Sequence, residues 1–338
     1  MKNLKFICCQ PDDDYYLWQV NLWLESLKNI GHSDKAIVLI FTPIFREQNK
    51  KWQMIVDLYP EATFYFHKDE DNINNLIQLY IPILRPYTLW KYFEKHPELS
   101  EDALFYCDSD ILFTDKFNVD KFIQDDVCYL SDTNHYINAT YFDSKQKDVL
   151  PTKLEEYKKR DILGELSEAI GISREIAEKH NEHSGGAQYL LKNIDAQFWK
   201  KVFNNTLYIR QYLLSVNKEF FKNENAGFQS WCADMWGVLW NIWFREQETK
   251  VVPELEFAWA TDPIEKLDRC TILHNAGVVS KNMDGVPYFY KGAYHTGQDP
   301  TKDPHLDVVL GNDSSKKKCT WYYANELKEL KNKYKLEY

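Results

Sequence analysis

The sequence lacks the long apolar run that marks a membrane span. Hydrophobic residues make up 44% of the 338 residues, yet no uninterrupted apolar stretch approaches the ~18 residues that a span requires. The amino-terminal sequence MKNLKFICCQPDDD also has no long apolar core followed by a small-residue cleavage site, as a signal peptide would have. We therefore expect a soluble, cytoplasmic protein with no membrane partner.

Positive charge and paired cysteines are also scarce. The chain has 41 lysines and arginines against 51 acidic residues, a formal net charge of −10. This balance disfavours broad electrostatic binding to nucleic acid or to an anionic membrane, although it leaves room for a local basic groove. The seven cysteines contain no Cys-x-x-Cys pair, which argues against a zinc knuckle, and their odd number argues against a disulfide framework.

Several common catalytic motifs are missing as well. The chain has no GxxxxGK[ST] loop, no GxGxxG after its first apolar run, no serine nucleophile elbow and no HExxH. The sequence therefore gives no support to a P-loop NTPase, a dinucleotide-dependent oxidoreductase, an α/β-hydrolase or a zinc protease of that type.

Short apolar runs alternate with amphipathic stretches through the first third of the chain. We expect strands at 4–9, 36–41, 63–66, 104–106 and 127–130, and helices at about 15–30, 47–59 and 87–95. Alternation of this kind is typical of an α/β fold in which helices cross over between parallel strands.

The rest of the chain has a different composition. Residues 145–183 are charged and helix-forming, and we expect a helical insertion or lid there. A strand should follow near 189–191, then a helix at about 196–204 and a tryptophan-rich helix at 231–243. We expect one catalytic domain, 1–315, followed by a basic C-terminal helix, 316–338, because no repeat or low-complexity linker divides the chain.

The most informative stretch is LFYCDSDILFT, from Leu104 to Thr114. Asp108 and Asp110 interrupt an apolar run that is typical of a strand leaving the core, and alternation along a strand would direct both side chains the same way. Two ionised carboxylates held together repel each other unless a divalent cation lies between them. Oxygen ligands suit Mg²⁺ or Mn²⁺. An acidic helix-capping turn is the alternative, but no helix start follows Asp110, so we predict a metal site.

Three further residues are candidates for the same site. His274 follows an expected strand in ILHNAG and could be a third metal ligand, although a histidine satisfied within the core is the commoner case. Asp234 lies among tryptophans, where a carboxylate needs a partner or a cleft, while the tryptophans themselves are more often core residues. Lys291 lies among tyrosines and is either a surface lysine or a cation that neutralises a bound diphosphate.

In this order, the segments FYCDSDILF, SGGAQYLL, WCADMW and ILHNAG resemble the GT-A class of glycosyltransferases. The resemblance implies a Rossmann-like α/β fold with a mixed sheet flanked by helices, a divalent ion, Mn²⁺ or Mg²⁺, and a nucleotide sugar such as a UDP-sugar as donor. The chain is most similar to phage-encoded glycosyltransferases, some of which modify DNA. It is distantly similar to hydroxyproline arabinosyltransferases and peptidyl serine galactosyltransferases.

The resemblance also implies roles for individual residues. The metal would be held by Asp108, Asp110 and His274. Asp234 would lie beside the anomeric carbon of the donor sugar, and Gln188 would line the same sugar. The donor-binding residues that it implies are Gln10, Asp12, Asp13, Arg85, Ser109, Gly185, Gly186, Gly277 and Lys291. Where the family often has a Lys-Pro-Trp-type turn, this chain has Tyr290-Lys291-Gly292.

The predicted reaction is transfer of a sugar to a hydroxyl, with either inversion or retention. Because the nearest resemblance is to phage proteins, the acceptor that we expect is a hydroxymethylated pyrimidine in DNA, in the cytoplasm of the host. DNA binding would require a basic groove, for example around 316–318 and the C-terminal helix. The alternatives are a protein hydroxyl or a glycan as acceptor, a nucleotide-sugar hydrolase, and a carbohydrate-binding module with a structural ion.

Overall fold

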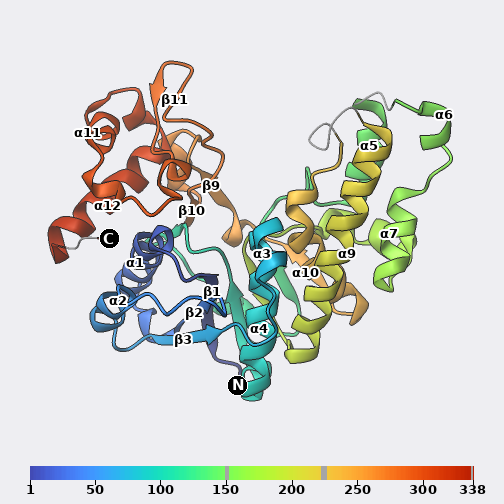
Figure 1. Cartoon of the computed structure of the whole chain (residues 1–338), viewed down its shortest axis with the longest axis horizontal. Helices are drawn as coiled ribbons and strands as arrows, with labels where there is room; N and C mark the ends of the chain where they lie inside the picture. The colour runs from blue at the N-terminus through green and yellow to red at the C-terminus, as the bar shows by residue number, and fades with distance from the viewer. Residues whose placement is uncertain (149–151, 222–226, 336–337) are drawn as a thin grey trace. The chain divides into compact units, whose positions relative to one another are not determined.

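The computed structural model describes residues 1–148, 152–221, 227–335 and 338, and it divides into two compact units (Figure 1). The parallel-sheet unit comprises Leu4–Asn72, Tyr106–Lys121 and Pro253–Tyr338. The helical unit comprises Met1–Asn3, Ile73–Phe105 and Phe122–Val252. Each unit is therefore assembled from segments that lie far apart in the sequence.

Three neighbouring strands of the parallel-sheet unit pair in parallel, in the order β3-β2-β1. The strands and their helices are β1 (Leu4–Pro11), α1 (Asp14–Asn29), β2 (Ala36–Thr42), α2 (Trp52–Leu58) and β3 (Thr63–Lys68). All seven residues of β2 are buried, as expected for a strand covered on both faces. The predicted alternation of strands and helices is confirmed, except that the second helix begins at Trp52 rather than near residue 47.

A second sheet in this unit contains β5 (Ile111–Phe113), β10 (Ile272–His274) and β9 (Phe257–Trp259). β10 runs antiparallel to β5 and parallel to β9. The expectation that Ile111–Phe113 resume the preceding strand is wrong. β4 (Ala103–Tyr106) ends before the two aspartates, and a turn at Ser109 and Asp110 leads the chain into this other sheet.

The C-terminal part of the parallel-sheet unit combines short strands with two α-helices. It contains the short strands β11 (Asn282–Met283) and β12 (Val286–Pro287) and the helices α11 (Pro304–Gly311) and α12 (Cys319–Tyr334). α12 falls within 316–338, the range expected for a basic C-terminal helix, and residues 336–337 of that range lie outside the described residues. α12 packs against α1 and against β9.

The helical unit contains a mixed group of strands and most of the helices. Its strands are β4, β7 (Tyr189–Leu191), β6 (Cys128–Leu130) and β8 (Thr249–Val251), in this spatial order, with β6 antiparallel to β7 and parallel to β8. Outside the insertion described below, its α-helices are α3 (Asn74–Leu79), α4 (Leu84–Lys95), α9 (Ala196–Phe220) and α10 (Ala233–Phe244). α9 packs against both α4 and α10, and it is much longer than the predicted helix at 196–204.

The predicted helical insertion is also found in this unit. It contains α5 (Ala139–Asp148), α6 (Leu154–Tyr157), α7 (Ile162–Ile170) and α8 (Arg174–Lys179), while residues 149–151 of its expected range lie outside the described residues. The predicted α/β class, with a mixed sheet, flanking helices and a helical insertion, is confirmed. None of the helices in the described part of the chain combines the length and the apolar character that a bilayer span needs.

We expect Glu25 to contribute a pH-dependent stabilising contact between α1 and α12. Burial alone would raise the pKa of Glu25, but hydrogen bonds from Lys333, Tyr59 and Tyr334 outweigh it and lower the pKa. A depressed pKa stabilises the fold above the unfolded value of about 4.3, and this contribution disappears as the pH falls through the folded value. Glu25→Gln should reduce the free energy of unfolding by about 1–2 kcal/mol at pH 7.

Urea unfolding of the wild type and of Glu25→Gln at pH 7 and near pH 3 would measure this contact. The difference between the two proteins should be largest at neutral pH and should shrink in acid. A difference that is the same at both values would contradict the assignment.

Candidate metal and donor site

Strand pairing brings Asp110 and His274 together. Asp110 directly precedes β5, and the antiparallel register of β5 and β10 places Ile111 opposite His274. The backbone N–H of Asn275 donates to the carbonyl of Asp110 at 3.0 Å, which extends the pairing by one residue. The two side chains therefore meet at the end of the second sheet.

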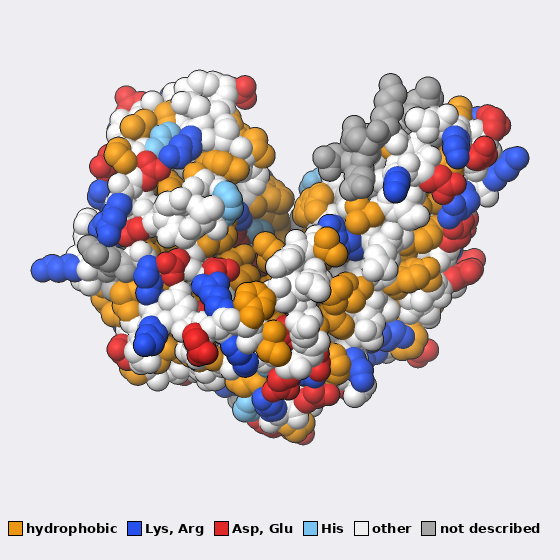
Figure 2. All heavy atoms as spheres, in the orientation of Figure 1, with side chains coloured by type: hydrophobic (Ala, Val, Ile, Leu, Met, Phe, Trp, Pro, Cys, Tyr) orange, Lys and Arg blue, Asp and Glu red, His pale blue; other side chains and the backbone are white. Residues whose placement is uncertain are grey.

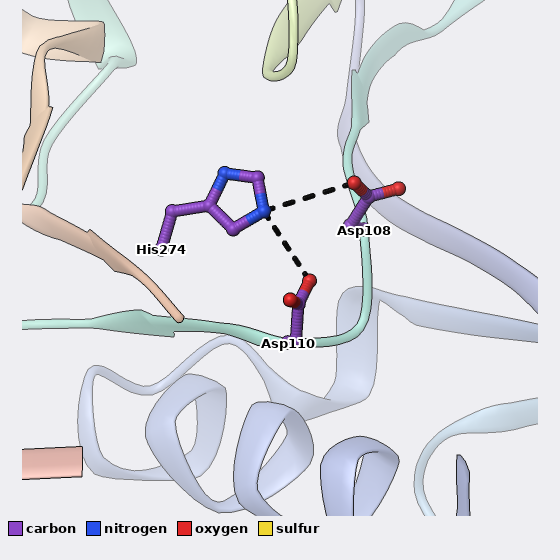
Figure 3. Close-up of side chains that lie close together, drawn as sticks. All are labelled: Asp108, Asp110 and His274. Carbon is purple, nitrogen blue, oxygen red and sulfur yellow. Dashed lines mark ion pairs between the residues drawn. The ribbon is translucent and has the colours of Figure 1, made fainter. Parts of the chain in front are cut away.

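The three predicted metal ligands converge on one point (Figure 3). Nε2 of His274 lies 3.8 Å from Oδ2 of Asp108 and 3.4 Å from Oδ1 of Asp110. Each residue offers one ligand atom, and these atoms all lie within 4.8 Å of one another. The two carboxylates converge because the chain turns between them, and not because they alternate along one strand as the sequence suggested.

The surroundings of Asp110 keep its carboxylate charged. Burial alone would raise the pKa of Asp110, but the charges of Lys291 and His274 and their hydrogen bonds outweigh it and hold the pKa well below its usual range. The ammonium of Lys291 forms an ion pair with Oδ2 of Asp110. The His274 ring stacks on Trp259, with centroids 5.8 Å apart and an interplanar angle of 10°. The carboxylate is thus in the ionised form that a metal ion requires.

These residues fit a divalent cation. Two carboxylate oxygens and one imidazole nitrogen form a donor set that Mn²⁺ accepts readily and that Mg²⁺ tolerates. An octahedral ion held by these three side chains would retain positions for phosphate oxygens or water. Ser109 lies in the turn between the two aspartates and is buried, so its predicted contact with the donor stays a prediction.

The residues predicted to hold the nucleobase lie at the end of β1 and just after it, and they have different surroundings. Gln10 is buried beside the thiol of Cys8, and Asp13 forms an ion pair with Arg46 at 2.5 Å. Asp12 is fully buried. Its carboxylate accepts hydrogen bonds from the Thr42 hydroxyl at 2.9 Å, the Asn49 backbone N–H at 3.0 Å and the Trp52 indole at 2.7 Å. These bonds hold the chain before α2 and explain why that helix begins late.

Asp12→Asn should therefore reduce stability. An asparagine presents a donor where the carboxylate accepts, so at least one of the three buried hydrogen bonds is lost, at about 1–3 kcal/mol. Asp13→Asn is the matched control, because its ion pair with Arg46 is exposed and such pairs contribute only about 0–1 kcal/mol. Urea unfolding measures both variants. Weaker UDP binding by Asp12→Asn at unchanged stability would instead favour the nucleotide-binding role.

Asp234 lies at the start of α10 in the helical unit and is held by two residues. Its Oδ1 accepts a hydrogen bond from the Tyr80 hydroxyl at 2.7 Å, and its Oδ2 lies 3.1 Å from the Arg85 guanidinium. Burial, followed by the charge of Asp234, raises the pKa of Tyr80 well above its usual value. Tyr80 therefore stays protonated and donates. Nothing in the local sequence around Tyr80 indicated its hydrogen bond to Asp234. Arg85 was predicted to bind phosphate, and in the structure its guanidinium lies beside Asp234.

The SGGAQYLL segment in the same unit is tightly packed. A Cβ on Gly185 would lie 2.2 Å from the Ser131 carbonyl oxygen, and one on Gly186 would lie 2.3 Å from the Tyr189 hydroxyl. Gln188 is fully buried, and its side-chain oxygen accepts a hydrogen bond from the Ser131 hydroxyl at 2.6 Å. Close packing thus requires both glycines. A role of these residues in donor binding stays a prediction, as does that of Gly277, whose φ of +83° requires glycine after β10.

No protein-family model matches the chain, and no curated protein matches it. Among solved structures it is similar to the apo form of the bifunctional glycosyltransferase WbbM, with 9% identity and a TM-score of 0.46 over 91% of this chain and 51% of that one. The chain thus spans about half the length of that structure.

Two smaller structures are also similar. Mouse xyloside xylosyltransferase 1, in its apo form, has 10% identity and a TM-score of 0.38 over 82% of this chain and 99% of that one. The galactosyltransferase LgtC, in complex with donor and acceptor sugar analogs, has 10% identity and a TM-score of 0.38 over 87% and 94%. Likenesses this weak assign no activity, which must be argued from the residues themselves.

Proposed function

We propose that the chain is a metal-dependent glycosyltransferase of the GT-A class, which moves a sugar from a nucleotide diphosphate sugar to a hydroxyl. The observation that carries the proposal is the convergence of Asp108, Asp110 and His274. The Lys291 ammonium forms an ion pair with the Asp110 carboxylate of this cluster. The sequence resemblance supports the proposal, because its four segments include both the aspartates and the histidine of this cluster.

The residues of the cluster have distinct tasks in this proposal. Asp108, Asp110 and His274 hold the ion, which when bound supplies a Lewis acid for the diphosphate leaving group. The imidazole in the donor set favours Mn²⁺ over Mg²⁺, because Mg²⁺ prefers oxygen ligands alone. Lys291 moves from Asp110 to the phosphates and neutralises charge that develops there. We further propose UDP as the nucleotide carrier.

Asp234 is the proposed catalytic carboxylate in the helical unit. It acts as a general base on the acceptor hydroxyl if the reaction inverts, or stabilises an oxocarbenium-like centre if it retains. Tyr80 and Arg85 hold the carboxylate in one orientation by contacting one oxygen each.

Two arguments bear on the acceptor: the sequence resemblance and the distribution of surface charge. A hydroxymethylated pyrimidine in DNA is the acceptor that the phage resemblance suggests. However, lysines of the C-terminal segment already pair with acids: Lys316 with Asp313, Lys328 with Asp307 and Lys333 with Glu25. On the face in Figure 2, basic side chains are interspersed with acidic ones. These pairings favour a glycan or a protein hydroxyl over DNA.

A panel of nucleotide sugars tests the proposal. Each donor is incubated with the protein and Mn²⁺, with and without hydroxymethylated DNA or an oligosaccharide mixture, and release of the nucleoside diphosphate is measured. We expect release from one donor that depends on both the metal and an acceptor. Release of free sugar that no acceptor stimulates would instead identify a hydrolase. Glycan binding without any turnover, unaffected by UDP, would identify a carbohydrate-binding module.

A further inference from the structure

We propose that Trp231 and Tyr136 form a stacking platform in the helical unit that binds a sugar ring of a carbohydrate acceptor, with Asp234 beside it. The term acceptor rests on the proposed function, whereas the binding site itself does not. The site has an exposed indole, a carboxylate three residues further along the chain and a tyrosine hydroxyl that contacts both residues.

Exposure distinguishes Trp231 from the other tryptophans of its segment. Trp231 is 55% exposed, whereas Trp236, Trp240 and Trp243 of α10 are between 0% and 3% exposed. Tyr136 is buried, and its ring supports Trp231 from below, with centroids 5.8 Å apart and an interplanar angle of 37°. Two further apolar side chains of this unit are exposed, Leu79 at 73% and Ile81 at 51%, and they flank Tyr80. Of the three side chains, only Trp231 adjoins another aromatic ring in this unit and precedes a buried carboxylate, which makes it the candidate for sugar stacking.

One hydrogen-bond network fixes the platform relative to Asp234. The Tyr80 hydroxyl lies 2.6 Å from the Trp231 carbonyl oxygen and 2.7 Å from Oδ1 of Asp234, and the Asp234 N–H lies 3.3 Å from the same hydroxyl. Trp231 belongs to a short 3₁₀ helix, Ser230–Cys232, that leads directly into α10. The Arg210 guanidinium covers the Tyr80 ring at 4.5 Å and donates to the Leu79 carbonyl at 2.9 Å. The backbone of Trp231 is therefore held close to the Asp234 carboxylate by one hydroxyl.

This arrangement suits a pyranose ring. A sugar has an apolar face of C–H groups, which gains free energy by packing on an indole, and a rim of hydroxyls that donate to a carboxylate and accept from a guanidinium. Asp234 and Arg85 supply those two groups. A nucleobase would also stack on Trp231, but phosphate groups contribute most of the affinity for nucleic acid, and the ion pair of Asp234 and Arg85 has no net charge to attract them. A paired acceptor and donor beside the indole thus favour a carbohydrate.

Glycan binding without donor or metal tests the proposal. The full-length protein is applied to an array of immobilised oligosaccharides, and the strongest ligand is titrated by calorimetry into the wild type, Trp231→Ala, Trp231→Phe and Tyr208→Ala. Tyr208 is the control, because it is 44% exposed on α9 of the same unit and stacks on Tyr212 instead. We expect Trp231→Ala to weaken binding about tenfold or more, Trp231→Phe to retain part of the affinity and Tyr208→Ala to bind like the wild type.

Three results would overturn the proposal: equal binding by the wild type and Trp231→Ala, binding of a single-stranded oligonucleotide that depends on Trp231 where no glycan binds, or no glycan binding at all. If Trp231→Ala does not fold, Trp231→Phe decides by its intermediate affinity. Asp110→Asn separates this proposal from the proposed function, because its metal ligand lies in the other unit. Trp231-dependent glycan binding without sugar transfer by the wild type would leave the platform valid and refute the transferase.

Discussion

Asp110→Asn should reduce sugar transfer with Mn²⁺ by about 10²- to 10³-fold or more. Asp110 is almost fully buried, and its carboxylate contacts both His274 and Lys291. An asparagine has nearly the same shape but no charge, so the cluster loses half of its carboxylate charge and the ion loses affinity. The leaving diphosphate then departs without a Lewis acid beside it.

Two measurements accompany the turnover assay. Electron paramagnetic resonance of free Mn²⁺ reports metal binding by the variant, and thermal unfolding reports whether the fold is intact. Asp115→Asn is the matched control, since Asp115 is exposed and lies five residues after Asp110. This variant should change neither sugar transfer, nor Mn²⁺ binding, nor thermal stability. Full transfer activity by Asp110→Asn would remove Asp110 from the metal site.

Asp234→Asn should abolish transfer while leaving binding of the nucleotide donor intact. The amide retains an oxygen for Tyr80 but has no charge, so it can neither take a proton from an acceptor hydroxyl nor stabilise a cationic centre. We expect kcat to fall by about 10²- to 10⁴-fold, the range for loss of a positioned proton acceptor. Arg85 would lose its ionic partner, and a small loss of stability should accompany the change.

Titration of UDP with Mn²⁺ into Asp234→Asn separates binding from chemistry. We expect a Kd close to that of the wild type and a loss confined to turnover. Asp132→Asn is the control in the same unit, because Asp132 is exposed and accepts only a local hydrogen bond from the Asn134 backbone. Unchanged turnover of Asp234→Asn would exclude it from the mechanism.

Much of the fold could be predicted because its signals are local. Apolar runs such as 36–41 and the helical spacing of 15–30 depend on neighbours within a few residues, so β1, α1, β2 and β3 were predicted almost to their ends. The late start of α2 could not be predicted, because it depends on the Asp12 carboxylate binding Asn49 and Trp52 across the end of β1. The separate pairing of β5 was missed for a similar reason, since an apolar run does not specify its partner.

The sequence by itself determined the α/β alternation, the carboxylate pair and the chemical types available to a site. Only the tertiary structure decided how those residues meet. The register of β5 and β10 places His274 against Asp110, and a turn rather than strand alternation makes Asp108 and Asp110 converge. Packing likewise decided that Trp231 alone of its segment is exposed and that Tyr80 and Arg85 hold Asp234. Contacts between distant segments depend on strand register and helix packing, which local hydrophobic periodicity does not encode.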